Sequence, residues 1–394
     1  MALGERLIFL CQGTQLYSAR SFAYWSFPTM PEVVELREVT DRRDVIHRAV
    51  QRLSLGDLVA LPSEAGYVLA GAALVETAGR RFQAAGEMVT LLLRAADEVA
   101  DFLPHLPKAG LRIARRCWPG PLVLRAPASA ANGFVAALPE SSRAAVIANG
   151  QMAVRVSSHP VLSEVAKLSR GPLLIREIEA SAKNLDFTVA PWTAAALIVK
   201  DSAATESNAD ARTSIVQINS QGAWTAERIG ATPENRLQVA ACELILFCCT
   251  GNTCRSPMAE SLFRHLLAER LKCSPEDLTK RGFLVASAGL AADYGSPASH
   301  ESVEMMKRRG IDLRSHTSQP LTDRLIEQID RCYTMTNSHR LAILDSHPEL
   351  ADRVQVLARD GRDVSDPIGG GMNEYAACAT SIEQHLTRIL DDIV

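Results

Sequence analysis

The chain has 394 residues, of which 47% are hydrophobic and 5% are aromatic, and its formal net charge is −3. This length predicts two or three domains with cores of their own. The charge excludes the basic footprint of a nucleic-acid-binding protein, and no apolar run reaches the length of about eighteen residues that spans a membrane. Nine cysteines without paired ligand spacing predict free thiols, no metal site and a cytoplasmic protein.

The first part of the chain is expected to form one α/β domain over residues 31–231. Residues 1–30 follow no periodic pattern before Met30 and are interpreted as a tail or a start-site artefact. Apolar periodicity within the domain predicts helices and strands, among them helices over Asp44–Leu53, Leu103–Cys117 and Val161–Leu168 and strands over Leu58–Leu61 and Met152–Val156. Residues 232–242 are the predicted linker to a second domain.

Residues 243–394 alternate strand and helix patterns, which is typical of a parallel sheet with crossover helices. The pattern predicts strands from Leu244 and over Phe283–Ser287, Arg331–Met335 and Val354–Val356, and helices over Ser256–Leu271, Ser299–Arg309, Ser338–Leu344 and Glu374–Ile393. The fold class is therefore α/β with two domains. Ligands in such sheets bind at the carboxyl ends of the strands, where the first loop of this second domain lies.

That first loop carries the sequence Cys-Thr-Gly-Asn-Thr-Cys-Arg-Ser from Cys249 to Ser256. A tight loop before a helix N-terminus points backbone N–H groups inward and binds anions. Cys249 is the predicted nucleophile and Arg255 the predicted phosphate clamp, with the helix N-terminus and the Arg255 charge activating the thiol. The phosphate-binding and supporting positions are Thr250, Gly251, Asn252, Thr253, Cys254 and Ser256, and Asn252 is expected to be left-handed.

The run from Cys249 to Phe263, together with Ser287-Ala-Gly289 and Tyr333-Thr-Met-Thr-Asn337, resembles the low-molecular-weight protein tyrosine phosphatase family. The resemblance implies a three-layer domain, phosphorylated proteins as substrates, a phosphocysteine intermediate and no cofactor. It also implies that Asp366, which precedes a proline, is the general acid. Cys254 either forms a reversible disulfide with the nucleophile, as in this family, or serves as a packing residue.

The choice of substrate is predicted from two side chains. Thr253 and the following residues are similar to the protein-arginine phosphatase branch, whereas tyrosine phosphatases of the family carry an aliphatic residue there. Ile368 replaces an aromatic residue and cannot stack on a phenol ring. We therefore favour phosphoarginine, with phosphotyrosine as the alternative. Thioredoxin-linked arsenate reduction would need two relay cysteines, and Cys332 and Cys378 are poorly placed for that task.

The first domain carries a second resemblance, to the threonylcarbamoyl-AMP synthase (YrdC-like) family. It rests on Leu58–Tyr67, on the Trp-Pro-Gly-Pro-Leu stretch after Cys117, on Val154–Pro160, and on Thr213–Val216 followed by Arg228-x-Gly. The resemblance implies a remnant of the synthase cavity, lined by Ser63, Tyr67, Arg155, His159 and Ser214.

This chain departs from the synthase family at the positions that bind ATP and carbonate in that family. Ala85-Gly-Glu87 stands where the family has Lys-x-Arg, and the Ser-x-Ala-Asn motif is absent from Arg176–Asn184. An anion site in which Lys and Arg are replaced loses the positive charges that bind phosphate and carbonate. The domain is interpreted as a degenerate synthase that is retained as a binding or regulatory module. The sequence does not decide whether this module binds a nucleotide. The alternative is a bifunctional protein that also makes threonylcarbamoyl-AMP for tRNA modification.

Overall fold

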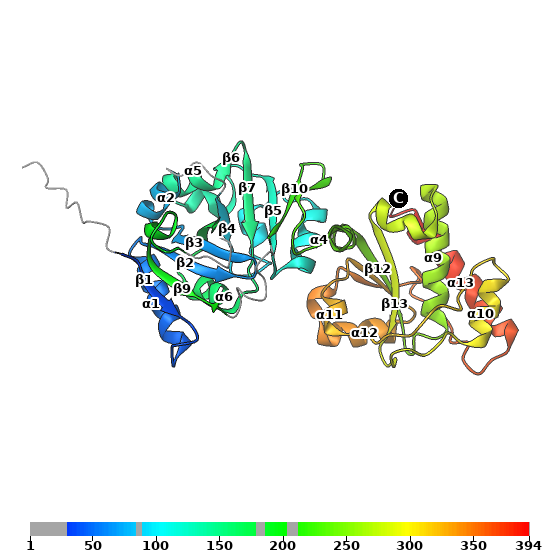
Figure 1. Cartoon of the computed structure of the whole chain (residues 1–394). Helices are drawn as coiled ribbons and strands as arrows, with labels where there is room; N and C mark the ends of the chain where they lie inside the picture. The colour runs from blue at the N-terminus through cyan, green and yellow to red at the C-terminus, as the bar shows by residue number, and fades with distance from the viewer. Residues whose placement is uncertain (1–29, 84–88, 179–185, 203–211, 394) are drawn as a thin grey trace, which may run out of the picture.

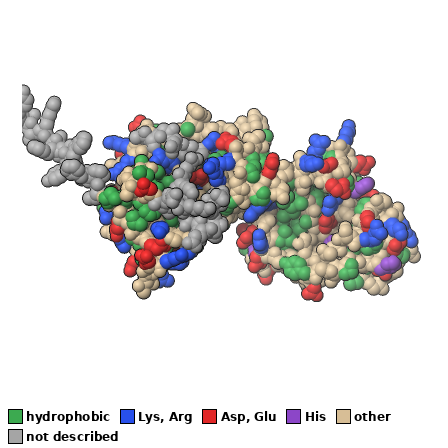
Figure 2. All heavy atoms as spheres, in the orientation of Figure 1, with side chains coloured by type: hydrophobic (Ala, Val, Ile, Leu, Met, Phe, Trp, Pro, Cys, Tyr) green, Lys and Arg blue, Asp and Glu red, His purple; other side chains and the backbone are tan. Residues whose placement is uncertain are grey.

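The computed structural model describes residues 30–83, 89–178, 186–202 and 212–393. Two α/β domains follow each other along the chain, each built on its own sheet (Figure 1). On the face shown in Figure 2, acidic and basic side chains are interspersed over both domains. Among the described residues, no helix has both the length and the apolar character that crossing a bilayer requires.

The N-terminal domain is organised around a mixed sheet. Its strands are β1 Glu32–Glu35, β2 Leu58–Ser63, β3 Gly66–Ala72, β4 Thr90–Leu92, β5 Leu122–Pro127, β6 Ile147–Ala148, β7 Gln151–Arg155, β8 Leu173–Ile178, β9 Ala195–Lys200, β10 Ser214–Ile218 and β11 Trp224–Arg228. The order is β1-β9-β2-β3-β8-β4-β7-β5-β10-β11, with β6 paired to β7. The β2–β3 pair is an antiparallel hairpin, whereas β4 and β7 run parallel.

Helices cover both faces of this sheet, because strand β2 is apolar on both sides. Val59 and Leu61 face one core and Leu58 and Ala60 face the other. The helices are α1 Arg42–Ser54, α2 Glu76–Gln83, α3 Val99–Phe102, α4 Lys108–Cys117, α5 Glu140–Val146, α6 Pro160–Leu168 and α8 Glu234–Ala241, with 3₁₀ turns at Gly133–Ala137 and Trp192–Ala194. Helices α1 and α6 pack on the first core, and α2, α4, α5 and α8 pack on the second.

Two segments of this domain differ from the sequence expectations or refine them. The helix predicted over Leu103–Cys117 begins only at Lys108, because Pro104 and Pro107 interrupt helical hydrogen bonding and restrict the residues before them. The predicted linker, residues 232–242, contains helix α8, whose Leu237 is fully buried in the N-terminal core. The exact domain boundaries stay predictions.

The C-terminal domain has a four-stranded sheet in its described residues, and every neighbouring pair in it is parallel, as predicted. Its strands are β12 Glu243–Cys249, β13 Phe283–Gly289, β14 Arg331–Thr334 and β15 Val354–Val356, in the order β13-β12-β14-β15. Its helices are α9 Arg255–Leu271, α10 His300–Lys307, α11 Asp323–Ile326, α12 Asn337–Ser346 and α13 Met372–Leu390, with 3₁₀ turns at Pro275–Arg281 and Pro348–Leu350.

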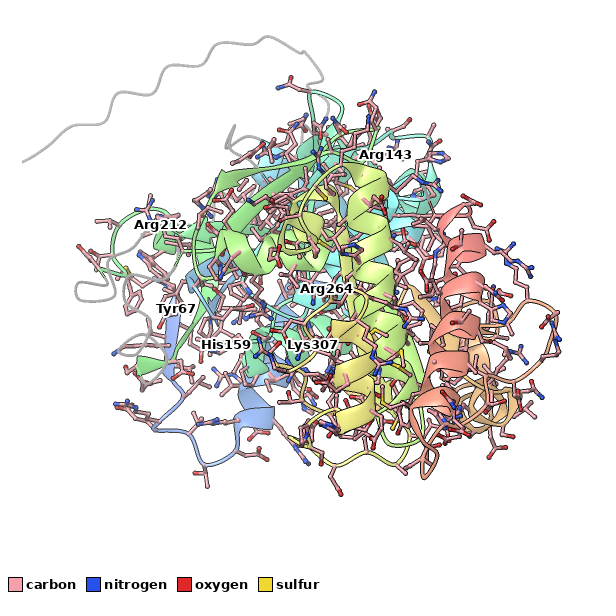
Figure 3. The ribbon with its side chains drawn as sticks, turned by 90° about the vertical axis from the view of Figure 1, so that its right-hand side faces the viewer. Tyr67, Arg143, His159, Arg212, Arg264 and Lys307 are labelled. Carbon is pink, nitrogen blue, oxygen red and sulfur yellow. The ribbon has the colours of Figure 1, made fainter. Side chains whose placement is uncertain are left out.

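Alternation along the central strand β12 produces the three layers. Phe247 and Cys249 face the core shared with α9 and α13, which lie toward the viewer in Figure 3. Leu246 and Cys248 face the opposite core, which includes Ile343 of α12. Because successive strand side chains point to opposite faces, Cys248 is core and Cys249 reaches the loop that follows it. The predicted three-layer domain is confirmed.

Candidate active site

The loop between β12 and α9 wraps around the sulfur of Cys249. The Asn252 backbone N–H donates to Cys249 Sγ over 3.3 Å, and Ser256 Oγ lies 3.0 Å from the same sulfur. Cys249 is 3% exposed. The thiol therefore lies at the base of the loop, with the Asn252 N–H directed toward it and the Ser256 hydroxyl within hydrogen-bond distance.

The side chain of Asn252 fixes the shape of this loop. Its φ of 54° lies in the left-handed region, as predicted, and asparagine tolerates this region better than most residues do. Asn252 Nδ2 donates to Ser256 Oγ and to Ser287 Oγ, both over 2.9 Å, while its Oδ1 accepts from the Gln319 N–H over 2.9 Å. Ser287 Oγ donates in turn to Glu260 Oε2 over 2.7 Å. Both the nitrogen and the oxygen of the buried Asn252 side-chain amide are thus hydrogen-bonded, and these bonds restrain the loop backbone.

Two histidines that the sequence analysis did not single out also hold the loop. His316 Nε2 lies 2.8 Å from the Asn252 carbonyl oxygen, and His339 Nε2 lies 2.9 Å from Thr250 Oγ1. Burial and then the nearby Arg255 charge lower the pKa of His339. Its position has a local sequence signal, because Thr336 caps helix α12 and accepts from the His339 backbone N–H.

The predicted phosphate clamp and the predicted acid lie in contact, although 111 residues separate them. Arg255 is the first residue of α9 and is 5% exposed, and its Nη2 forms an ion pair with the Asp366 carboxylate. Arg255 Nη1 donates to the Val364 carbonyl oxygen over 3.4 Å. The Ile368 N–H donates to Asp366 Oδ1 over 3.2 Å, which orients the carboxylate from its own loop.

The two positions expected to select the substrate differ in exposure. Thr253 is half-buried in the loop, and its carbonyl oxygen accepts from the Ser299 N–H over 2.9 Å. Ile368 is 69% exposed on the loop that carries Asp366. Gly251, the remaining loop position, is half-buried beside Thr253.

Cys254 is buried and, like Cys249, is a free thiol. Its sulfur lies 3.3 Å from the hydroxyl of Tyr375 on α13. Burial, followed by this contact, raises the pKa of Tyr375 to about 12, so the phenol stays protonated. Cys332 and Cys378, the cysteines weighed for an arsenate relay, lie in the cores on opposite faces of the sheet.

Two family models match separate parts of the chain. The model described as low molecular weight phosphotyrosine protein phosphatase matches residues 244–394, and a Sua5/YciO/YrdC model described as telomere recombination matches residues 51–206. The protein-arginine-phosphatase of Bacillus subtilis (strain 168) is 37% identical over 149 residues, which cover 37% of this chain and 93% of that protein. The chain belongs to the low-molecular-weight protein phosphatase family.

Other similar proteins include both branches of the family. The probable low molecular weight protein-tyrosine-phosphatase EpsP of Ralstonia nicotianae is 36% identical over 146 residues, covering 37% of this chain and 87% of that protein. The crystal structure of a YwlE mutant from Bacillus subtilis is 34% identical and covers 38% of this chain and 98% of that chain, with a TM-score of 0.34. The family match and the curated relatives make the C-terminal domain a cysteine-based phosphatase, and a YrdC-like domain precedes it.

In the YrdC-like domain, the predicted cavity residue Arg155 is enclosed by carboxylates. Its side chain is 0% exposed, and Nη2 lies 2.9 Å from Glu64 Oε2 while Nη1 lies 3.8 Å from Glu177 Oε1. Burial raises the pKa of Glu64, but Arg155 and hydrogen bonds from Ser157 and Ser158 outweigh it and lower that pKa to about 2. Glu64 therefore stays ionised and neutralises the arginine.

The other predicted cavity residues are buried as well, but they have different neighbours. Asp201 links two of them, since its backbone N–H donates to Tyr67 Oη over 3.1 Å and its carboxylate lies 3.7 Å from His159 Nε2 (both residues are labelled in Figure 3). Ser63 Oγ accepts from a backbone N–H within its own turn. Ser214 Oγ donates to the Thr232 carbonyl oxygen over 2.8 Å. The predictions for Ala85–Glu87 and for most of Arg176–Asn184 lie outside the described residues.

We expect Glu64→Gln to lower the free energy of unfolding of the N-terminal domain by about 3 kcal/mol, because the buried Arg155 charge loses its nearest carboxylate. The lowered pKa of Glu64 means that its contribution is complete above its usual value of 4.5 and is lost as the pH falls toward about 2. The difference between parent and variant should therefore shrink below pH 4.5 in denaturant unfolding.

A matched control for this experiment is Glu164→Gln, which removes an exposed carboxylate from helix α6. We expect it to change the stability by no more than about 0.5 kcal/mol. Equal stabilities of the parent and Glu64→Gln at pH 7 would show that Arg155 does not depend on Glu64.

Proposed function

We propose that the C-terminal domain hydrolyses phosphoarginine in proteins, through a phosphocysteine intermediate on Cys249. The observation that carries this proposal is the arrangement of the loop, in which the Asn252 N–H donates to the Cys249 thiol and the arginine that follows contacts an aspartate. A thiol, an anion-binding loop, a guanidinium and a carboxylic acid are the groups that phosphoryl transfer through cysteine requires.

In the proposed reaction, Cys249 Sγ attacks phosphorus while the bond to the leaving nitrogen breaks. Arg255 and the loop N–H groups bind the equatorial oxygens, where the charge of the transition state develops. Asp366 donates its proton to the leaving guanidine nitrogen. In the second step, the Asp366 carboxylate takes a proton from water, which attacks phosphorus, breaks the P–S bond and releases inorganic phosphate.

The preference for phosphoarginine rests on two side chains beside this loop. Thr253 offers a hydroxyl where an aliphatic side chain would pack on a phenol ring. Ile368, on the loop of Asp366, has no aromatic ring to stack on phosphotyrosine. The curated relative at 37% identity is named a protein-arginine-phosphatase, which supports the same preference. A protein tyrosine phosphatase with the same mechanism is the alternative.

Thr253→Ile should shift the ratio of kcat/KM values toward phosphotyrosine by about tenfold or more, because an apolar side chain replaces a hydrogen-bonding one in the pocket wall. The measurement is phosphate release from phosphoarginine and phosphotyrosine peptides of equal sequence context. Thr387→Ile, an exposed site on α13, is the matched control and should leave the ratio unchanged.

Two outcomes of this assay would count against the proposal. An unchanged ratio in Thr253→Ile would remove Thr253 as the selecting residue. Equal or faster turnover of the phosphotyrosine peptide by the parent enzyme would favour the tyrosine phosphatase alternative.

We further propose that the YrdC-like domain is a non-catalytic module. This is supported by the pairing of Arg155 with Glu64 and by the ion pair of Arg228 Nη2 with Glu177 Oε2 at 2.6 Å, since guanidinium groups held by carboxylates are less available to bind phosphates. Pyrophosphate release from ATP that depends on threonine and bicarbonate would instead establish the bifunctional alternative.

A further inference from the structure

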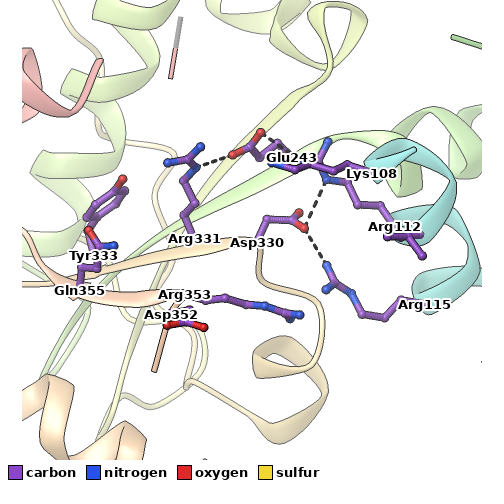
Figure 4. Close-up of a pocket in the computed structure, with 11 residues that line it drawn as sticks. Lys108, Arg112, Arg115, Glu243, Asp330, Arg331, Tyr333, Asp352, Arg353 and Gln355 are labelled. Carbon is purple, nitrogen blue, oxygen red and sulfur yellow. Dashed lines mark hydrogen bonds and ion pairs between the residues drawn. The ribbon is translucent and has the colours of Figure 1, made fainter. Parts of the chain in front are cut away.

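A pocket of about 340 Å³ lies between the two domains (Figure 4). Helix α4 of the YrdC-like domain forms one wall, and strands β12, β14 and β15 of the phosphatase domain form the other. Glu243, at the start of β12, lines the pocket, whereas Cys249 ends that strand. Six residues of extended strand place the two sites roughly 20 Å apart.

The α4 wall carries three cations on one helix face. Lys108, Arg112 and Arg115 are four and three residues apart, which is the spacing of neighbours along a helix surface. Arg112 Nη2 donates to Glu243 Oε2 and Arg115 Nη2 donates to Asp330 Oδ1, each over 2.9 Å. These ion pairs cross between the domains and hold both guanidinium groups in place.

Each oxygen of the two carboxylates that bind these arginines already accepts a hydrogen bond. Glu243 Oε1 accepts from Arg331 Nε, and its Oε2 accepts from Arg112. Asp330 Oδ2 accepts from the Leu244 N–H over 2.9 Å and from Arg116 Nη2 over 2.7 Å, while its Oδ1 accepts from Arg115. Burial raises the pKa of Asp330, but the Leu244 amide and the three arginines of α4 outweigh it and lower that pKa. Every oxygen of these two carboxylates therefore already accepts from an arginine or a backbone N–H.

The donors, in contrast, are in excess. A guanidinium has five N–H groups and an ammonium has three, and the ion pairs above use only some of them. Within the described part of the chain, Lys108 and Arg353 form no ion pair, and Arg115 Nε has no hydrogen-bond acceptor. The pocket is lined by five Lys or Arg residues and three Asp or Glu residues, an excess of two positive charges.

We propose that this interdomain pocket binds a small phosphate-bearing anion, such as pyrophosphate or the phosphate chain of a nucleotide. Phosphate oxygens accept from the N–H groups that the three lining carboxylates leave unpaired, and fixed guanidinium groups match their geometry. Ligand pockets of this size occur preferentially at domain interfaces. Because Lys108 and Arg353 belong to different domains, the bound anion bridges the domains and stabilises their contact.

The test is titration calorimetry of the full chain with pyrophosphate and, separately, with ATP. The double variant Lys108→Gln/Arg353→Gln should weaken binding at this site about tenfold or more, since two charged donors are removed. Lys167→Gln/Arg170→Gln removes the same two charge types from exposed positions of the N-terminal domain and should leave the affinity unchanged. Pyrophosphate should also raise the unfolding temperature of the parent by more than that of the pocket variant, which keeps only the anion-binding phosphatase loop.

A further variant separates this pocket from the phosphatase loop, which also attracts anions. Arg255→Met should remove only the binding contributed by the active site, while the pocket variant should keep the turnover of the parent. If the Lys108→Gln/Arg353→Gln chain binds pyrophosphate as the parent does, or if Arg255→Met abolishes all binding, the proposed site is overturned. Neither result depends on the substrate of the phosphatase.

Discussion

Cys249→Ser is expected to lower phosphate release by at least about 10⁴-fold, because a serine hydroxyl is a far weaker nucleophile than an activated thiol. The substitution is nearly isosteric, and the Asn252 N–H and Ser256 Oγ that contact the sulfur can contact an oxygen instead. The loop should therefore keep its shape. The loss would then measure the chemical role of the sulfur rather than a folding defect.

The matched control is Cys248→Ala. Cys248 is adjacent in sequence, but it faces the opposite core, so its loss should reduce stability slightly and leave turnover near that of the parent. Mass spectrometry of acid-quenched enzyme should find a phosphoryl group on Cys249 of the parent. Retention of more than a tenth of the activity by Cys249→Ser, or an equal loss in Cys248→Ala, would show that another group is the nucleophile.

Asp366→Asn is expected to lower kcat by about 10²- to 10³-fold, because an amide can neither protonate the leaving nitrogen nor deprotonate water. The carboxylate is already positioned, since it pairs with Arg255 and accepts from the Ile368 N–H. Asparagine can keep the second contact, so the loop should persist. The ion pair with Arg255 is lost, which should leave the arginine freer to bind phosphate oxygens.

The dependence on the leaving group separates an acid from a merely structural residue. For aryl phosphates, the loss in Asp366→Asn should shrink as the leaving group becomes more acidic, because a better leaving group needs less protonation. Asp363→Asn, which alters an exposed carboxylate of the same loop, should have little effect. A loss of equal size for every leaving group would indicate that Asp366 only shapes the loop.

The sequence by itself determined those parts of the protein that depend on neighbouring residues. The alternation in β12, the loop after Cys249 and the helix from Arg255 are contiguous, so apolar periodicity and the tolerance of Asn252 for a left-handed backbone specify them locally. The parallel sheet follows from the same local alternation of strands and helices. Pro104 and Pro107 are a local signal of the same kind, since they delay the start of α4 to Lys108.

Only the tertiary structure decided which distant side chains meet. The contact of Arg255 with Asp366 and the contact of His316 with the loop depend on how the strands are ordered in the sheet, and no local pattern encodes that order. The same holds for Glu64 and Arg155, whose pairing follows from the burial of an arginine that needs a carboxylate. The pocket between α4 and the phosphatase sheet exists only because two domains pack together, so residues such as Lys108 carry no sign of it in the sequence.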